Sequence, residues 1–405
     1  MPSLQYPGVY VEEMPGPPPR ITSAPTSITA FLGAACRGPV NQPTPIASFA
    51  DFERIFGGLS ESSPLGFAVR DFFRNGGRQA VIVRLRRPSS SPRGKTVPQR
   101  IIGLTSADYL GTKKRKTGIF ALEKTELFNI LCLPPPAFSR DLSAKVWAAA
   151  AKYCEARRAF LIVDAPESWR SAAAAKGDGA TTGIAGLGTK SANAAVFFPR
   201  LREPNPLHAN AVEEFAVSGA IAGVFARTDD ARGVWKAPAG IEATLRGVTA
   251  LNINLSDAEM SLLNPLGLNC LRATPLQPVI WGARTLEGDN RFASEWKYIP
   301  VRRLALFIES SVERGTRWAV FEPNDVPLWV RIRLTAENFL NELFRAGAFQ
   351  GATPKQAYFV KCGSDTTTAR EIATGLLNLE IGFAPLNAGE FVILRLPLRA
   401  ARAFA

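Results

Sequence analysis

Two long apolar patterns at helical spacing, toward the carboxyl end, constrain the fold of this chain more than any other feature. The spacing predicts one helix over 301–313 and a second between the capping residue Asp325 and Gly347. A short strand is predicted after each helix, at 317–321 and at 358–361. Helices with such wide apolar faces need a sheet to cover them, which predicts an α/β or α+β domain. The apolar positions are Leu304, Phe307, Ile308 and Val312 in the first helix, and Leu328, Trp329, Ile332, Phe339, Leu340, Leu343 and Phe344 in the second.

With 405 residues, of which 46% are hydrophobic and 20% charged, the chain is long enough for two or three domains. It has no apolar run of about 18 residues, so we expect no insertion into a membrane. Its first residues, MPSLQYPGVYVEE, carry acids where a signal peptide carries bases, so we expect no Sec export.

Five cysteines are scattered along the chain without a C-x-x-C pair. We favour buried thiols in a reducing cytoplasm, with a disulfide or a metal site as the alternative. A structural zinc site needs histidines and cysteines at close spacing, and the chain has a single histidine. We therefore predict no metal and no cofactor. The cysteines are Cys36, Cys132, Cys154, Cys270 and Cys362.

The net charge of +13 is unevenly distributed. Ten bases and one acid, Asp108, lie between residues 80 and 116. Part of this excess is the loop 111–118, which reads GTKKRKTG and has no interleaved aromatic residues. Such a patch can contact phosphate, nucleic acid or an acidic protein, or it can be a solvated connector.

The order of predicted elements indicates two α/β regions. In 23–95, strands and helices alternate as in half of an α/β layer, and a polar, proline-punctuated linker at 88–98 is the best domain boundary. From 99 to 290, strands alternate with helices again, which suggests a mainly parallel or mixed sheet. The alanine- and glycine-rich tract 171–190 is predicted to be a loop.

Both ends of the chain carry strand-like segments. Near the start, four residues have β character, and the prolines that follow them, up to Pro19, bar regular structure. This segment is either a strand on a stiff leash or a frayed terminus. Near the end, 375–383 and 390–396 read as strands, followed by the basic residues Arg399 and Arg402. The four residues near the start are Tyr6, Val9, Tyr10 and Val11.

One set of residues occurs in the order of a catalytic triad, but its spacing and context do not match a known signature. Asp164, His208 and Ser218 occur in the order of a subtilisin-like triad, yet Ser218 follows His208 by only ten residues and lacks a G-x-S-x-G context. The glycines between 177 and 188 miss both the Walker and the G-x-G-x-x-G spacings. We keep a serine hydrolase using these three residues as the alternative function and predict that the chain is not an enzyme.

Several phrases, in register along nearly the whole chain, resemble contractile tail sheath proteins of phages, bacteriocins and injection systems. YPGVYVEE resembles the amino-terminal arm of that family, and RTDDARGVWKAP and WGART resemble its middle. YIPVRRLALFIESSVERGTRWAVFEPND, FLNELFRAGAFQG, AYFVKC and IGFAPLNAGEFV resemble its carboxy-terminal part. The basic loop 111–118 and the tract 171–190 match nothing in this pattern.

The resemblance implies an inner core domain built from 23–95 and 291–388, with 96–290 inserted as an outer α/β domain. The segments 1–22 and 389–405 would be an arm and a strand with a basic tail. Each arm would add a strand to the sheet of a neighbour, so that the array stays linked while it contracts. The strands that we predict for this role comprise Tyr6, Val9, Tyr10 and Val11, and Phe391, Val392, Ile393, Leu394, Arg395 and Leu396.

The implied partners are other copies of the chain, an inner tail tube protein, and baseplate and tail-terminator proteins. We expect no small-molecule substrate and no direct contact with nucleic acid. Arg331, Asn338 and Arg345, near one helix face, are our prediction for the surface that meets an acidic tube, with an ordinary solvated helix face as the alternative. Assembly is expected in the bacterial cytoplasm, and the product would be a phage tail or a released contractile particle.

Overall fold

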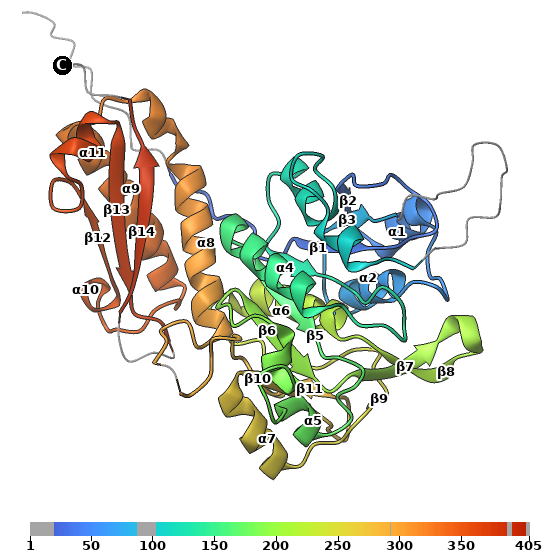
Figure 1. Ribbon diagram of the computed structural model, residues 1–405. Helices are drawn as coiled ribbons and strands as arrows, with labels where there is room; N and C mark the ends of the chain where they lie inside the picture. Colours follow the sequence, from blue (N-terminus) through green and yellow to red (C-terminus); the bar gives the residue numbers. More distant parts are fainter. Residues whose placement is uncertain (1–19, 87–102, 292, 387–390, 402–405) are drawn as a thin grey trace, which may run out of the picture. The chain divides into compact units, whose positions relative to one another are not determined.

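The computed structural model describes residues 20–86, 103–291, 293–386 and 391–401. It divides the chain into two compact units, each of which mixes helices with sheet (Figure 1). This confirms the predicted α/β class. The large unit comprises Ser23–Ser310 and Ala384–Val392, and the small unit comprises Met1–Thr22, Ser311–Phe383 and Ile393–Ala405.

An eight-stranded sheet forms the centre of the large unit. Its strand order is β11-β10-β6-β5-β4-β1-β3-β2, and only the edge strands β2 and β11 run antiparallel to their neighbours. Most of its strands are buried along their whole length, as is usual for parallel strands covered on both faces. The strands are β1 (Thr29–Gly33), β2 (Thr44–Ile46), β3 (Ala80–Arg84), β4 (Ile130–Cys132), β5 (Phe160–Asp164), β6 (Ala194–Phe198), β10 (Leu268–Arg272) and β11 (Val279–Ile280).

Helices cover both faces of this sheet because successive side chains of a strand point to opposite sides. On β1, Ala30 and Leu32 join one hydrophobic cluster and Phe31 joins the other. The first cluster includes Trp147 of α4, and the second includes Phe72 of α2. The helices are α1 (Phe49–Phe56), α2 (Leu65–Arg74), α3 (Ser106–Leu110), η1 (Gly118–Lys124), α4 (Ala144–Arg157), α5 (Ala172–Lys176), η2 (Gly183–Leu187), η3 (Pro206–His208), α6 (Ser218–Arg232), α7 (Asp257–Leu263) and η4 (Asn264–Leu266).

The chain divides at a different place from the one that the sequence predicts. In the structure β1 pairs in parallel with both β3 and β4, so that Thr29 lies opposite Ala80 and opposite Ile130. Strands from the predicted segments 23–95 and 96–290 therefore share one sheet, and the division falls after Ser310. A polar linker marks a surface connection, but it does not decide whether the next strand joins the same sheet. Residues 87–102 lie outside the described part of the chain.

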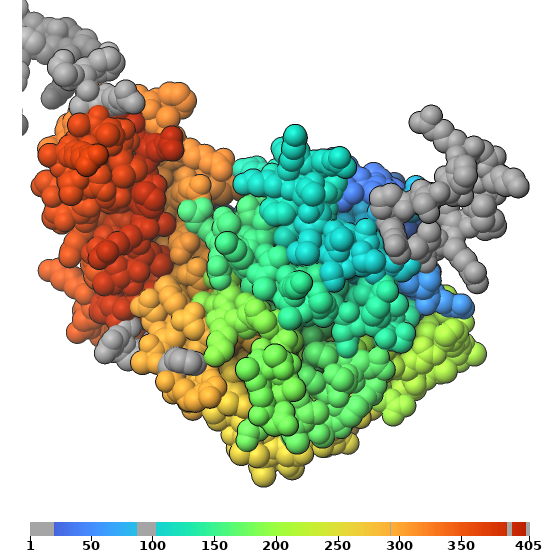
Figure 2. Space-filling model, in the orientation of Figure 1, coloured from blue at the N-terminus to red at the C-terminus, as the bar shows by residue number. Residues whose placement is uncertain are grey.

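A second, smaller sheet in the large unit has the order β8-β7-β9. Its hairpin, coloured yellow-green, projects from the surface of the unit (Figures 1 and 2). On the first strand, Leu201 and Glu203 are buried while Arg202 is exposed, which is the alternation of a strand with one covered face. The strands are β7 (Leu201–Asn205), β8 (Ala211–Phe215) and β9 (Ala250–Leu251).

The small unit is a three-stranded sheet with the order β12-β13-β14, and the long helix α9 lies behind it in Figure 1. Asp325 caps α9 as predicted, because its carboxylate accepts a 3.0 Å hydrogen bond from the Leu328 amide. The strands are β12 (Tyr358–Cys362), β13 (Leu376–Phe383) and β14 (Val392–Arg399). The helices are η5 (Arg317–Phe321), α9 (Val326–Arg345), α10 (Pro354–Ala357) and α11 (Ala369–Ala373), and α8 (Ile299–Gly315) begins in the large unit.

Two local predictions are corrected. The segment 317–321, predicted to be a strand, is the 3-10 helix η5, because no strand lies beside it and its turns continue directly from α8. The tract 171–190 is not one loop but contains the short helices α5 and η2. In the same unit, α6 begins at Ser218 and continues to Arg232, where Gly233 ends it at a φ of 87°.

The large unit buries a cluster of charges between α2 and β7. Arg70 donates a 2.7 Å hydrogen bond to Glu203, and it also bonds to its neighbour Asp71 at 3.0 Å. Both carboxylates are almost fully buried. Burial, together with the nearby Asp71 carboxylate, raises the pKa of Glu203 well above its ordinary value. Burial also raises the pKa of Asp71, although Arg70 opposes that effect.

We predict that this cluster makes the large unit less stable as the pH rises. Above about pH 4.5, unfolded Glu203 releases its proton, whereas folded Glu203 keeps its proton up to a higher pH. The free energy of unfolding should therefore fall with rising pH until the folded pKa is passed. Glu203→Gln should flatten this fall, and Glu53→Gln, at an exposed position of α1, should leave it unchanged. Denaturant midpoints between pH 5 and 9 measure the effect, and parallel curves for all three proteins would contradict it.

Candidate functional site

Asp164 and Ser218, two members of the candidate triad, are in contact. The Ser218 hydroxyl donates a 2.8 Å hydrogen bond to the Asp164 carboxylate, which also accepts from the amides of Val217 at 2.9 Å and Ser218 at 2.7 Å. Burial raises the pKa of Asp164 to about 6, against the opposing effect of these hydrogen bonds. The carboxylate ends β5 and accepts the free amides at the start of α6, which is the role of a helix-capping group.

His208 does not complete a triad. It lies in η3 at the tip of the β7–β8 hairpin, where its Nδ1 is 2.5 Å from Glu213 and its Nε2 is 3.7 Å from Glu61. The hydrogen bond with Glu213 raises the pKa of His208. Because the Ser218 hydroxyl already donates to Asp164, it has no histidine base to take its proton. The structure gives the hydrolase alternative no support.

The described residues also contain no candidate metal site. Among them, no three histidine, cysteine or acidic side chains lie close enough to share an ion. All five cysteines are free thiols, and Cys36 is the exposed one. Burial raises the pKa of the Cys132, Cys154 and Cys270 thiols, as it does for Cys362, so these groups are neutral near neutral pH.

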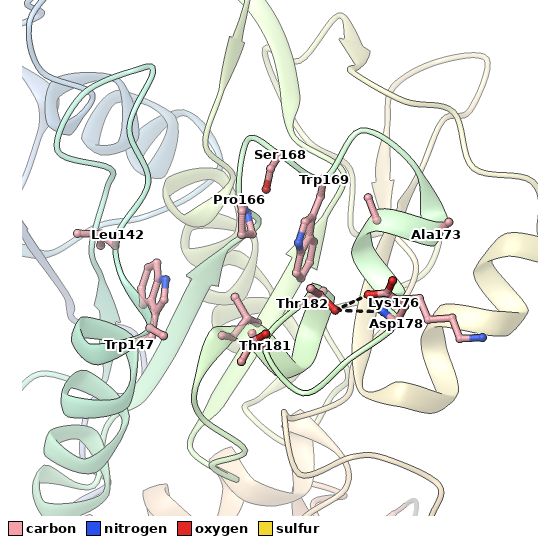
Figure 3. A pocket seen from close by; sticks show the side chains of 16 residues that line it. Leu142, Trp147, Pro166, Ser168, Trp169, Ala173, Lys176, Asp178, Thr181 and Thr182 are labelled. Atoms are coloured by element: carbon pink, nitrogen blue, oxygen red, sulfur yellow. Dashed lines mark hydrogen bonds between the residues drawn. The ribbon is translucent and has the colours of Figure 1, made fainter.

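The glycine-rich tract borders a cavity of about 990 Å³ between α4, α5 and η2 (Figure 3). Trp147 and Trp169 contribute to its wall, but each side chain is only 4% exposed. A Cβ on Gly183 would lie 2.4 Å from the backbone nitrogen of Gly177, so the glycines allow two turns to touch. Thr182 closes this turn with a 2.9 Å hydrogen bond to Asp178 (Figure 3). The tract therefore folds into a tight turn in which its glycines allow close backbone contacts.

The described bases between residues 80 and 116 do not form one surface. Arg84 is buried, and its guanidinium donates to the backbone carbonyls of Ala35, Cys36 and Gly38. Lys113, Lys114, Arg115 and Lys116 are exposed in the loop 111–118. The remaining bases of the region, apart from the exposed Arg86, lie outside the described residues.

The predicted carboxyl-terminal strand is β14, at the edge of the small unit's own sheet. Burial alternates strictly along it, with Val392, Leu394 and Leu396 covered and Ile393 and Arg395 exposed. Pro397 lies within β14, and prolines in strands are tolerated at sheet edges. Phe391 precedes the strand and is 38% exposed. Tyr6, Val9, Tyr10 and Val11 lie outside the described residues.

The three residues predicted to meet a tube lie on α9, but they differ in environment. The Arg331 guanidinium stacks 4.6 Å from the centre of the Trp318 ring and pairs with Glu322 at 3.4 Å. Asn338 and Arg345 are exposed. Their helix face continues toward the start of α9 as the exposed apolar residues Leu334, Val330 and Val326. In the sequence, these residues cannot be told from the buried apolar positions of the same helix.

Known families match most of the chain. Residues 103–286 match the family described as phage tail sheath protein central domain, and residues 293–399 match the phage tail sheath C-terminal domain. The chain belongs to the contractile tail sheath family. This confirms the resemblance drawn from the sequence.

Individual sheath proteins agree with this assignment. The tail sheath protein of Vibrio phage KVP40 is 31% identical over 111 residues, which are 27% of this chain and 16% of that protein's length. The anti-feeding prophage sheath, solved in its contracted state, is 27% identical with a TM-score of 0.72, covering 97% of this chain and 99% of that one. A chain of the anti-feeding prophage baseplate is also 27% identical, with a TM-score of 0.69 over 97% and 98% of the two chains.

This sheath protein has no described helix that combines the length and the apolar content needed to cross a membrane. Its sequence is basic overall, with a net charge of +13. Arg70, Arg84 and Arg331 bond to carboxylates or backbone carbonyls of their own unit.

We predict opposite outcomes for the two triad positions that sequence alone could not separate. Ser218→Ala removes one of three hydrogen bonds to the buried Asp164 carboxylate and should lower the free energy of unfolding by about 1–3 kcal/mol. His208→Ala, at the exposed hairpin tip, should leave the unfolding midpoint unchanged. Urea titrations followed by tryptophan fluorescence measure both. A Ser218→Ala protein as stable as the wild type would contradict the capping role.

Proposed function

We propose that this chain is the structural subunit of a contractile tail sheath. Copies polymerise into stacked rings around an inner tube, and contraction of the array drives the tube through a target envelope. The observation that carries this proposal is the match over 97% of the chain to a sheath solved in its contracted state. Contraction would release a metastable packing, so the subunit itself would perform no bond chemistry.

Strand addition between neighbours is the proposed means of holding the array together. The edge of a sheet presents unpaired amides and carbonyls that can accept another strand. In the small unit, β12 and β14 are the two edges. We propose that the segment around Tyr6 to Val11 of one copy, and β14 of another, add to the small-unit sheet of a neighbour. Pro15 to Pro19 would act as the connecting leash.

The inner tube is the proposed partner of α9. Asn338 and Arg345 are exposed on its carboxyl-terminal half, and Arg331 lies near the same face. An acidic tube would be attracted to the arginines, and such contacts weaken as salt screens them. We further propose that the ends of the array meet baseplate and tail-terminator proteins, as the match to a baseplate chain suggests. Assembly would occur in the bacterial cytoplasm, yielding a phage tail or a released contractile particle.

Deletion of residues 1–22 should abolish assembly of an otherwise folded protein. We expect tubes or rings from the full chain in negative-stain electron microscopy, with tube protein added, and only monomers from the deletion variant. His208→Ala is the matched control and should assemble like the wild type. Monomers from the full chain under several salt conditions, with tube protein present, would overturn the proposed function.

Arg345→Glu should weaken assembly on the tube. The change places an acid opposite an acidic surface, so we expect at least a tenfold lower yield of tube-bound sheath at low salt. Lys355→Glu, an exposed position of α10, makes the same charge change as a control. Co-sedimentation with tube protein measures the yield, and equal losses for both variants would remove α9 as the tube surface.

A further inference from the structure

The small unit exposes a run of large apolar side chains at the start of α9. Phe321 is 87% exposed and Val326 is 60% exposed. Val330 and Leu334 follow at intervals of four residues, with 36% and 44% exposure. Residues four apart share a helix face, so these three positions form one line along α9. We call Phe321, Val326, Val330 and Leu334 the apolar stripe.

The stripe is not part of the core of the small unit. The opposite face of α9 carries Leu328, Ile332 and Phe339, each almost fully buried, and α9 packs against β12. The helix is therefore apolar on two faces, and one face suffices to cover its sheet. Single exposed apolar residues are ordinary, but a contiguous set on one element marks a contact surface.

The described end of the chain arrives beside this stripe. After β14, the Ala401 amide donates a 2.9 Å hydrogen bond to the carbonyl of Glu322. Ala401 also forms a parallel bridge with Pro323. Glu322 follows Phe321 directly, and the parallel bridge means that the chain at Ala401 runs in the same direction as the chain at Pro323, which leads to the start of α9. The next residues are Arg402, Ala403 and Phe404.

We propose that residues 402–405 lie on the apolar stripe of their own chain, with Phe404 as the anchor. Three extended residues span about 10 Å, which suffices to reach from Ala401 to the first turn of α9. The charges favour this placement, because the basic Arg402 would lie near the acidic Glu322 and Asp325 at the start of α9. Glu322 already pairs with Arg331. Asp325 caps α9 and its side chain is exposed, so we expect Arg402 to pair with the Asp325 carboxylate.

The docked segment covers apolar surface in the free subunit. Under the proposed function, transfer of β14 to a neighbouring copy would carry Phe404 away and uncover the stripe. Docking in the free subunit itself does not depend on assembly. A failure to form sheaths would therefore leave this inference untouched, and the test below uses dilute, monomeric protein.

A disulfide trap tests the placement. In a Cys36→Ser background, which removes the exposed native thiol, Val326→Cys is combined with Phe404→Cys. The control pair is Glu342→Cys with Phe404→Cys, because residue 342 lies about 24 Å further along α9. We expect an intrachain disulfide at least tenfold faster in the first pair, since the bond requires Cα atoms within about 7 Å. Equal rates, or crosslinks only between two copies, would overturn the proposal.

A second measurement identifies the occupant. Val326→Cys carries an environment-sensitive thiol dye, again in the Cys36→Ser background. Phe404→Ser should shift the dye emission to the red, because the anchor is lost, whereas Phe404→Leu should preserve the wild-type emission. An emission that ignores Phe404→Ser and moves only when tube protein is added would overturn the proposal and assign the stripe to the tube.

Discussion

β1 pairs in parallel with β3 on one side and with β4 on the other, and the large unit depends on this double pairing. Each strand contributes alternate side chains to the two faces, so Phe31 and Leu32, adjacent in sequence, belong to different cores. A central strand of this kind must be apolar throughout, and all five residues of β1 are buried. The helices on both faces follow from that requirement, because each face needs its own cover.

Buried polar groups then fix how those helices sit within the unit. Asp164 ends β5 and receives three hydrogen bonds from the start of α6, which sets that helix against the sheet. Further along α6, Asp229 accepts two hydrogen bonds, of 2.8 and 2.6 Å, from Arg303 at the beginning of α8. Both of these side chains are nearly fully buried, and a paired, bidentate geometry is what makes such burial tolerable. Asp164 was a candidate for catalysis in the sequence, but in the fold its carboxylate orients a helix.

The small unit differs from the large unit in that its sheet has three strands and its long helix exposes apolar side chains. Its sheet packs against α9, and β12 and β14 are the two edge strands among the described residues. A subunit that exchanges strands with neighbours needs edges of this kind, which ordinary monomeric proteins avoid. The apolar stripe is a second feature of the same type, since it offers contact area that the unit does not use for its own core. The proposed occupant of the stripe in the free subunit is the end of its own chain, and strand transfer to a neighbour would uncover it.

The sequence by itself determined the two long helices near the carboxyl end and the family. The cap at Asp325, the apolar spacing of α8 and α9, and the phrases between residues 298 and 362 are local patterns that act within a few residues. Only the tertiary structure decided that β1 lies between β3 and β4, that Ser218 meets Asp164 while His208 lies elsewhere, and that Arg331 stacks on Trp318. Such contacts join residues far apart in the chain. These contacts form because the whole fold gains stability from the apolar area and the hydrogen bonds that it buries. No short sequence pattern encodes the stability of the whole fold.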